Sequence, residues 1–120
     1  MQLDPPPLKP TNIPNDIKFD LVILSYQVWY LAPAMPITAF MQSSEAKRLL
    51  KGKPIVTLVA CRNMWLAAHD AMQGLIAHVG GTLRDHVVLV DRGHALATFI
   101  TTPRWVLTGR RDRFLGLPPA

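Results

Sequence analysis

Three short runs of apolar residues, most of them β-branched, constrain the fold of this chain more than any other feature. They cover residues 21–24, 55–60 and 87–90. Uninterrupted apolar runs of this length are typical of strands that are buried on both faces of a parallel sheet. The sequence therefore predicts three parallel strands with both faces covered.

Consecutive runs are joined by segments with helical periodicity. The first segment has Pro36 where the first turn of a helix tolerates proline, and its pattern stops before Gly52. In the second segment Asn63 is a favourable N-cap residue, and the apolar face ends at Gly80. Strands that alternate with helices through short connections form parallel sheets with right-handed crossovers. The predicted fold class is therefore α/β, a doubly wound parallel sheet of about three strands with flanking helices.

The two ends of the sequence differ from its centre. Prolines at positions 5, 6, 7, 10 and 14 remove backbone donors and favour extended conformations, so residues 1–19 are predicted to form a Pro-rich extended arm. Residues 20–102 are predicted to form the α/β core, with a short helix or a loop at 95–100. Residues 103–120 are predicted to be a basic, aromatic tail, because Arg104, Trp105 and Phe114 lie there with three further arginines.

Composition restricts the expected cellular location and the expected binding partners of the protein. The single cysteine, Cys61, cannot form an intramolecular disulfide, and the first ten residues lack the basic and apolar regions of a secretory signal, so a cytoplasmic location is expected. Residues 21–44 carry no charge over a length that could span a bilayer, but Pro33, Pro36 and the β-branched first half favour a strand, a loop and a helix over a membrane span. The formal net charge of +5 favours anionic partners, yet no nucleic-acid-binding module is recognisable, and nucleic acid is not an expected partner.

Two polar and aromatic segments follow the first two predicted strands. In open parallel sheets, ligands bind at the carboxyl ends of the strands. The first segment consists of Ser25, Tyr26, Gln27, Val28, Trp29 and Tyr30. The second consists of Cys61, Arg62, Asn63, Met64 and Trp65. Both are predicted to be loops, and both are candidate ligand-binding segments.

Each segment allows more than one interpretation. The three aromatic rings of the first could stack on a flat heteroaromatic ligand, or Trp29 and Tyr30 could pack beneath the following helix. In the second segment, Arg62 and the amino end of a helix favour an anion or a carbonyl group. Cys61 is either a reactive thiol or a small buried apolar residue, and the residues around it favour the buried role.

Histidines and acidic residues give weaker indications of chemistry. His69, His78, His86 and His94 share no metal-ligand spacing with one another or with Cys61. No metal site is therefore predicted. Asp91, Arg92 and His94 follow the third strand, where they could act as acids or bases, or Asp91 could instead pair with Arg92 or cap a helix.

The run FDLVILSYQVWYLAPAMPITAFMQS, followed by LLKGKPIVTLVACRNMW, resembles the central part of flavodoxin-like proteins. That family has a hydrophobic strand, a loop of the form GSPVWYG, a helix that starts with proline, and a lysine-glycine-lysine lead into the next strand. The stretches YQVWYL, ACRNMW and TTPRW resemble a bacterial subgroup labelled dialkylresorcinol condensing enzymes. The resemblance extends from Phe19 to Trp105, and no segment before Pro5 resembles the family's phosphate-binding strand and loop.

The resemblance implies an FMN site and a redox role. Residues 25–30 would lie against the isoalloxazine ring, and residues 61–65 would form a second flavin-facing loop. The chain would then be an FMN-associated redox protein or a fragment of one, and a flavin-dependent oxidoreductase if it is an enzyme. Two alternatives are a non-catalytic interaction subunit that keeps the scaffold without the flavin, and a dialkylresorcinol-type condensing enzyme that uses Cys61.

The first predicted strand, which begins at Leu21 and ends at Leu24, also predicts association. In a flavodoxin-like sheet it would lie inside the sheet, and no earlier strand of this chain pairs with it. An apolar strand edge without lysine, proline or a bulge exposes unpaired N–H and C=O groups. We therefore expect a homo-oligomer, or a complex with another chain, that forms through this strand. The alternative is that the Pro-rich arm folds back over the strand, but its prolines cannot donate hydrogen bonds to it.

Overall fold

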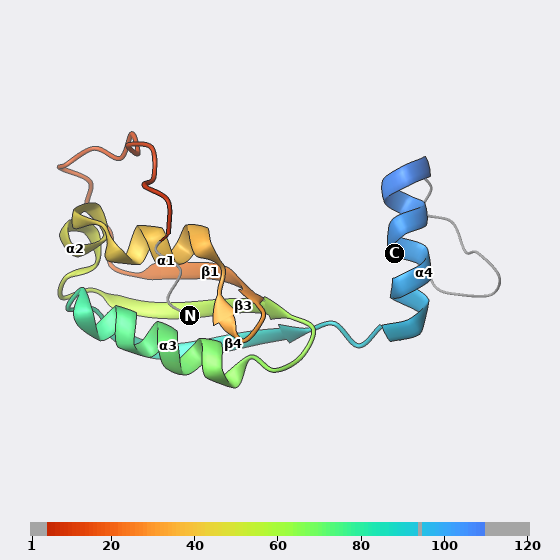
Figure 1. Cartoon of the computed structure of the whole chain (residues 1–120). Helices are drawn as coiled ribbons and strands as arrows, with labels where there is room; N and C mark the ends of the chain where they lie inside the picture. The colour runs from red at the N-terminus through yellow and green to blue at the C-terminus, as the bar shows by residue number, and fades with distance from the viewer. Residues whose placement is uncertain (1–4, 94, 110–120) are drawn as a thin grey trace. The chain divides into compact units, whose positions relative to one another are not determined.

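The computed structural model describes residues 5–93 and 95–109 (Figure 1). The chain divides into two compact units, Met1–Val90 and Asp91–Ala120. The predicted core, 20–102, therefore includes residues 91–102 that belong to the second unit.

The first unit contains a four-stranded sheet with the order β2-β1-β3-β4. Strands β1 (Val22–Trp29), β3 (Pro54–Cys61) and β4 (Thr82–Val90) are parallel, and the short β2 (Ala32–Pro33) pairs antiparallel with the end of β1. Tyr26 of β1 lies opposite Val59 of β3, which in turn lies opposite Val88 of β4. The predicted α/β class and the mainly parallel sheet are confirmed.

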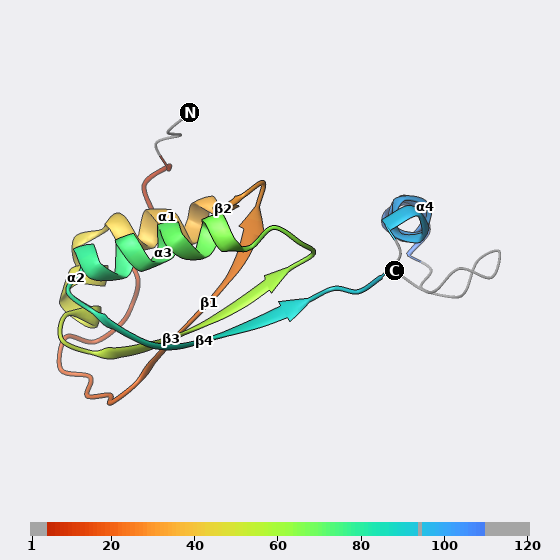
Figure 2. The same cartoon turned by 90° about the horizontal axis from the view of Figure 1, so that it is seen from below.

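Helices α1 (Met35–Gln42), α2 (Ser44–Leu50) and α3 (Leu66–His78) follow β2 and β3, and α1 and α3 contact each other over the same face of the sheet (Figure 2). The order β1-β3-β4 proceeds in one direction, and right-handed crossovers then place the connecting helices on one face. The doubly wound arrangement, with helices on both faces, is not found within residues 5–90. The α/β class, the mainly parallel sheet and the flanking helices of that prediction hold.

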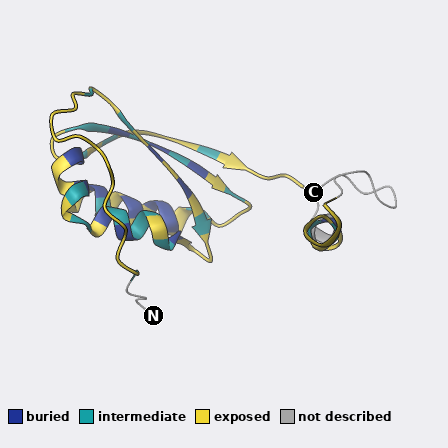
Figure 3. Cartoon of the chain, turned by 90° about the horizontal axis from the view of Figure 1, so that it is seen from above, coloured by how far each residue is buried: buried dark blue, intermediate teal, exposed yellow. Residues whose placement is uncertain are grey.

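Within residues 5–90 no helix covers the second face of the sheet, and we call it the open face (Figure 3). It carries alternate residues of the three long strands, namely Ile23, Ser25 and Gln27 of β1, Val56, Leu58 and Ala60 of β3, and Asp85, Val87 and Leu89 of β4. Ile23 is 63% exposed and Leu89 is 57% exposed. The prediction that these runs are buried on both faces is therefore wrong within the first unit, because α1, α2 and α3 cover one face alone.

The helix-covered face holds the core. The buried cluster comprises Leu24, Tyr26, Met41, Ala46, Leu49, Leu50, Ile55, Val59, Met72, Ile76 and Val79. It draws on β1, β3 and all three helices, and alternate strand residues contribute because successive side chains of a strand point to opposite faces.

Strands β1 and β4 are longer than predicted. Residues 25–29 continue β1 instead of forming a loop, because Leu24 and Tyr26 are buried while Ser25 and Gln27 are exposed, the alternation of a half-buried strand. Strand β4 begins at Thr82, directly after Gly81, and not at residue 87. A bulge in β4 lies between the pairs Ile55–Leu83 and Val56–Asp85.

The predicted first helix is two helices. Pro36 stands in the first turn of α1, as predicted, but the chain turns extended at Ser43. The Ser43 hydroxyl accepts a hydrogen bond from the Ala46 N–H at 3.1 Å and so caps α2. Ser43 thus separates α1 from α2 within the connection between β1 and β3. Leu49 and Leu50 of α2 still pack in the core.

The arm and the second unit complete the described chain. Residues 5–19 contain no helix or strand, in keeping with an extended arm. In the second unit, α4 (Ala95–Thr108) replaces the expected short helix or loop and continues through Pro103. The remainder of the predicted tail, with Arg110, Arg111, Arg113 and Phe114, lies outside the described residues.

Candidate functional site

A shallow groove of about 370 Å³ lies along the outer edge of β1, near its carboxyl end. We call it the edge groove. It is lined by Ser25, Tyr26, Gln27, Trp29, Ala34, Pro36 and Ile37. Four of these residues belong to the predicted first segment, and the others come from the start of α1 and the residue before it. The groove therefore lies at the carboxyl end of a parallel strand, where ligands bind in open α/β sheets.

Trp29 forms the aromatic wall of the edge groove. Its side chain is 53% exposed, and its indole N–H donates a hydrogen bond to Oε1 of Gln27 at 3.3 Å. This bond restrains the indole while leaving the Gln27 amide NH₂ group able to donate elsewhere. The alternative that Trp29 packs beneath the next helix is not what the structure shows, since half of its surface is open to solvent.

The turn after Trp29 is conformationally unfavourable. Tyr30 and Leu31 have φ angles of 46° and 70° and connect β1 to β2 as a two-residue hairpin loop. Such loops normally contain glycine or asparagine, because other side chains pay a steric penalty in the left-handed region. The turn leaves Tyr30 94% exposed, outside the lining of the groove. Strain of this kind is often found at binding sites, which makes the turn a candidate part of this one.

The second predicted segment lies elsewhere. Cys61 is the last residue of β3 and is half-buried, while Arg62, Asn63 and Met64 are exposed in the loop before α3. The Asn63 side chain accepts a hydrogen bond from the Met64 N–H at 2.8 Å, and α3 begins at Leu66 without a side-chain cap. The prediction of Asn63 as the N-cap is therefore wrong. None of residues 61–65 lines the edge groove, so the structure does not combine the two segments in one pocket.

Trp65 instead belongs to an aromatic cluster with two histidines. Its ring centroid lies 5.7 Å from that of His86 and 6.0 Å from that of His69, and the two imidazoles are 4.4 Å apart. His69 is 8% exposed, and its Nδ1 has no hydrogen-bond partner among the described residues. Its other ring nitrogen lies 3.2 Å from the Gln73 amide nitrogen. The spacing of Trp65 and His69 by four residues was the available sequence signal, but nothing in the sequence placed His86 beside them.

Two side chains of the core have shifted pKa values. Burial, and next the charge of His86, lower the pKa of His69, while Asp70 opposes this with a smaller effect. Burial, and next the proximity of Cys61, raise the pKa of Tyr26. The Tyr26 hydroxyl has no hydrogen-bond partner among the described residues. Cys61 therefore lies near a buried phenol.

The histidine cluster predicts a loss of stability in mild acid. The folded protein favours neutral His69, whereas the unfolded chain binds a proton with an ordinary pKa of about 6.5. The free energy of unfolding should therefore fall as the pH is lowered from about 6.5 toward the lower pKa of the folded state. Urea unfolding at pH 7.5 and 5.5 measures this difference.

His69→Phe should reduce the pH dependence, and His78→Gln, at an exposed position of the same helix, should preserve it. If His69→Phe retained the full difference between the two pH values, a different group would be responsible.

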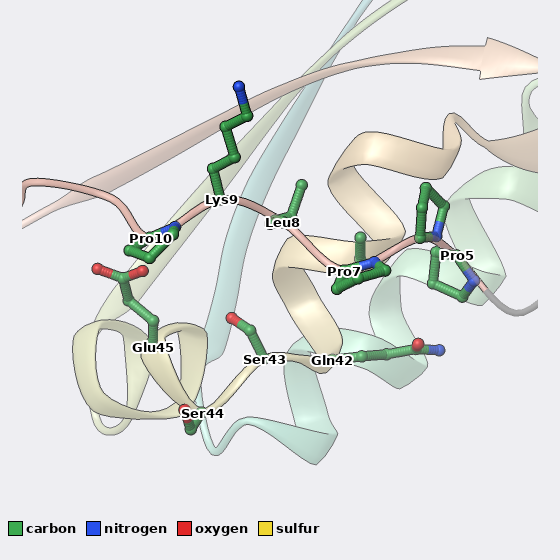
Figure 4. Close-up of a pocket in the computed structure, with 11 residues that line it drawn as sticks. Pro5, Pro7, Leu8, Lys9, Pro10, Gln42, Ser43, Ser44 and Glu45 are labelled. Carbon is green, nitrogen blue, oxygen red and sulfur yellow. The ribbon is translucent and has the colours of Figure 1, made fainter.

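A second hollow, of about 560 Å³, lies between the arm and the junction of α1 and α2 (Figure 4). The arm residues Pro5 to Pro10 form one wall, and residues 42–45 form most of the other. The Thr11 hydroxyl donates a hydrogen bond to Glu45 and ties the arm to α2. Sequence reasoning did not predict this contact, because proline-rich extended segments carry no periodicity that identifies their neighbour.

Two further predictions concern the third strand and the membrane. The Asp91 carboxylate accepts a hydrogen bond from the Gly93 N–H at 2.8 Å and closes a turn, while His94 lies outside the described residues. Residues 21–44 fold into β1, β2, α1 and the start of α2. Within the described residues, no helix has the length and apolar character needed to cross a bilayer.

Comparison of the sequence with family models gives no match, and searches of curated proteins and of solved structures give none either. The flavodoxin-like resemblance consequently remains a prediction from the residues quoted above.

Proposed function

We propose that this protein binds a flat heteroaromatic ring in the edge groove, and that the ring is the isoalloxazine of FMN or a related flavin. The observation that supports this most is that four residues predicted from the sequence to contact such a ring line one groove at the carboxyl end of β1. The exposed indole of Trp29 offers a stacking surface, and Ala34, Pro36 and Ile37 offer an apolar floor.

The lining of the edge groove suits the isoalloxazine ring of a flavin better than the phosphate group of FMN. None of the seven lining residues carries a charge. A flavin supplies one- and two-electron redox chemistry when bound. The contribution of this chain would be to stack Trp29 on the ring, to offer the Gln27 amide to a polar ring edge, and to exclude water with the apolar floor. Riboflavin, which has no phosphate, is therefore expected to bind about as tightly as FMN.

Trp29→Ala should weaken flavin binding. Aromatic stacking contributes on the order of 1 kcal/mol beyond the burial of area, so a loss of about fivefold or more is expected. Titration of flavin fluorescence with the full chain measures the affinity. Met64→Ala is the matched control, because Met64 is 59% exposed in the second segment but does not line the groove.

An unchanged affinity in Trp29→Ala, or the absence of any flavin binding, would contradict the proposal. FMN affinity more than tenfold above that of riboflavin would instead indicate a phosphate site away from the groove.

A second candidate function, an interaction subunit that associates through β1, is favoured by a different observation. The open face exposes apolar side chains on two of its strands, namely Ile23 of β1 and Val87 and Leu89 of β4. Large exposed apolar patches on soluble proteins usually mark interaction sites. The predicted association through the strand edge that begins at Leu21 belongs to this candidate, because the same strand borders the open face.

Leu89→Lys tests the candidate. A lysine on the open face should reduce the binding of a hydrophobic fluorescent dye, because it interrupts the apolar surface. Leu66→Lys is the matched control, since Leu66 is 65% exposed at the start of α3 and lies on the helical side. Equal effects of the two substitutions would show that the open face has no special role.

A further inference from the structure

The outer edge of β1 lacks a neighbouring strand over most of its length. On its inner side, residues 22–27 pair with β3. On its outer side, β2 pairs only with Val28 and Trp29, and no other strand of the described chain pairs there. Residues 22–26 therefore form a free strand edge.

One hydrogen bond fixes which backbone groups point outward. The N–H of Ala34 donates to the C=O of Gln27 at 2.9 Å across the outer edge. The backbone groups of successive residues in a strand point to opposite sides, so those of Ile23 and Ser25 also point outward. Leu24 and Tyr26 then direct their backbone groups toward β3.

We propose that a second copy of this chain pairs with this edge in antiparallel orientation, with Leu24 of one copy opposite Leu24 of the other. The proposal rests on the second candidate function. The pairing joins two sheets into one continuous sheet and satisfies the outward backbone groups of Ile23 and Ser25.

The charge of the edge favours a second copy as the occupant. From Leu21 to Trp29 the strand has no charged residue, so two copies related by a two-fold axis meet no like charges. An apolar hollow lies at each end of the edge. One is the edge groove, and the other is formed by the first residues of β1 together with residues of the arm, α1 and α2, namely Ile13, Ile17, Phe19, Leu21, Val22, Leu24, Phe40, Leu49 and Leu50. An identical apolar strand matches such an edge without a complementary charge.

The backbone geometry selects the register. A two-fold axis perpendicular to the sheet places residues of the same face opposite each other. With Leu24 on the axis, Ile23 lies opposite Ser25 of the second copy, and both have outward backbone groups. With Ser25 on the axis, Gln27 would have to pair with Ile23 of the second copy, but Ala34 already occupies its outward carbonyl. With Ile23 on the axis, the outer pairs would need Leu21, which precedes β1.

The arrangement has a consequence for the edge groove. Val22 of the second copy lies opposite Tyr26, next to the position at Gln27 that Ala34 occupies. Tyr26 and Gln27 line the groove. A bound ring and a second copy therefore exclude each other, and saturating riboflavin should shift the protein toward the monomer.

Sedimentation equilibrium of the full chain tests the association. The apparent mass should approach twice 13.4 kDa as the concentration is raised. A mass that stays at that of the monomer throughout would overturn the proposal.

Disulfide cross-linking tests the register. Cys61 is the single cysteine, so Cys61→Ala gives a background without thiols, and its own dimerisation is checked first. Ile23→Cys and Ser25→Cys then each place a thiol on an exposed position. The Cα atoms of Ile23 and of Ser25 in the second copy would be about 5.5 Å apart, within the range of a disulfide. Oxidation of an equal mixture should therefore yield mainly the mixed disulfide, and each variant alone should yield several-fold less dimer.

Other cross-linking patterns overturn the proposal in distinguishable ways. A dimer that forms disulfides through Leu89→Cys in place of the mixed pair would associate through the open face, which keeps the interaction candidate but rejects the edge. A monomer whose dye binding is insensitive to Leu89→Lys would reject both.

Discussion

Replacing Ile55 by alanine is expected to lower the free energy of unfolding by about 3 kcal/mol. Ile55 is fully buried in β3 and pairs with Leu83 of β4, next to the bulge. The substitution removes three buried carbons and leaves a cavity that the central strand cannot close by moving. Domains of this size have a total stability of about 5–15 kcal/mol, so the loss is a large share of it.

Urea unfolding followed by circular dichroism measures this loss as a lower midpoint with an unchanged slope. Leu66→Ala, at a residue that is 65% exposed, is the control and should change stability by no more than about 0.5 kcal/mol. An Ile55→Ala variant as stable as the control would mean that the core is not packed around β3.

Gly81→Ala should destabilise the protein by about 1–3 kcal/mol through steric overlap. A Cβ atom at Gly81 would lie 2.4 Å from Cδ1 of Ile55 and 3.4 Å from both Cγ2 of Ile76 and the Leu50 carbonyl oxygen. Ile55 and Ile76 are buried, so neither side chain has free space to enter. Urea midpoints of the variant and the unmodified chain give the loss.

Two further variants separate overlap from any other effect of the methyl group. Ile55→Val removes the Cδ1 atom that is nearest to the added Cβ, so the double variant should be more stable than the sum of the two single effects. Gly74→Ala places the same methyl group in α3 with no atom within 4 Å and should stabilise by about 0.5–1 kcal/mol. Strict additivity in the double variant would contradict the overlap.

The sequence predicted the elements better than their arrangement. Apolar runs and helical spacing identified the three long strands and the positions of α1 and α3, because those patterns report burial along one element. They did not show that α1, α2 and α3 share one face, since a fully apolar run has the same composition whether its second face is covered or open. The break at Ser43 was missed because the apolar spacing continues across it.

Only part of the candidate site was predicted, and the physical reasons are similar. Residues 25–30 were singled out for their aromatic rings, and four of the six line the edge groove. The assignment of residues 25–29 to a loop was wrong because the polar residues Ser25 and Gln27 alternate with buried ones, which is a strand pattern. The contribution of Ala34, Pro36 and Ile37 depends on how α1 passes over β1, and no local pattern encodes that contact.

Hydrogen exchange of the β1 backbone amides tests most directly the central claim that the outer edge of β1 is free and is the binding surface of this protein. In dilute solution, the N–H groups of Leu24 and Tyr26, directed toward β3, should exchange slowly, and those of Ile23 and Ser25 should exchange rapidly. At high protein concentration, Ile23 and Ser25 should become protected. Equal and strong protection of all four amides in dilute solution would contradict the account, because another segment would then already pair with this edge.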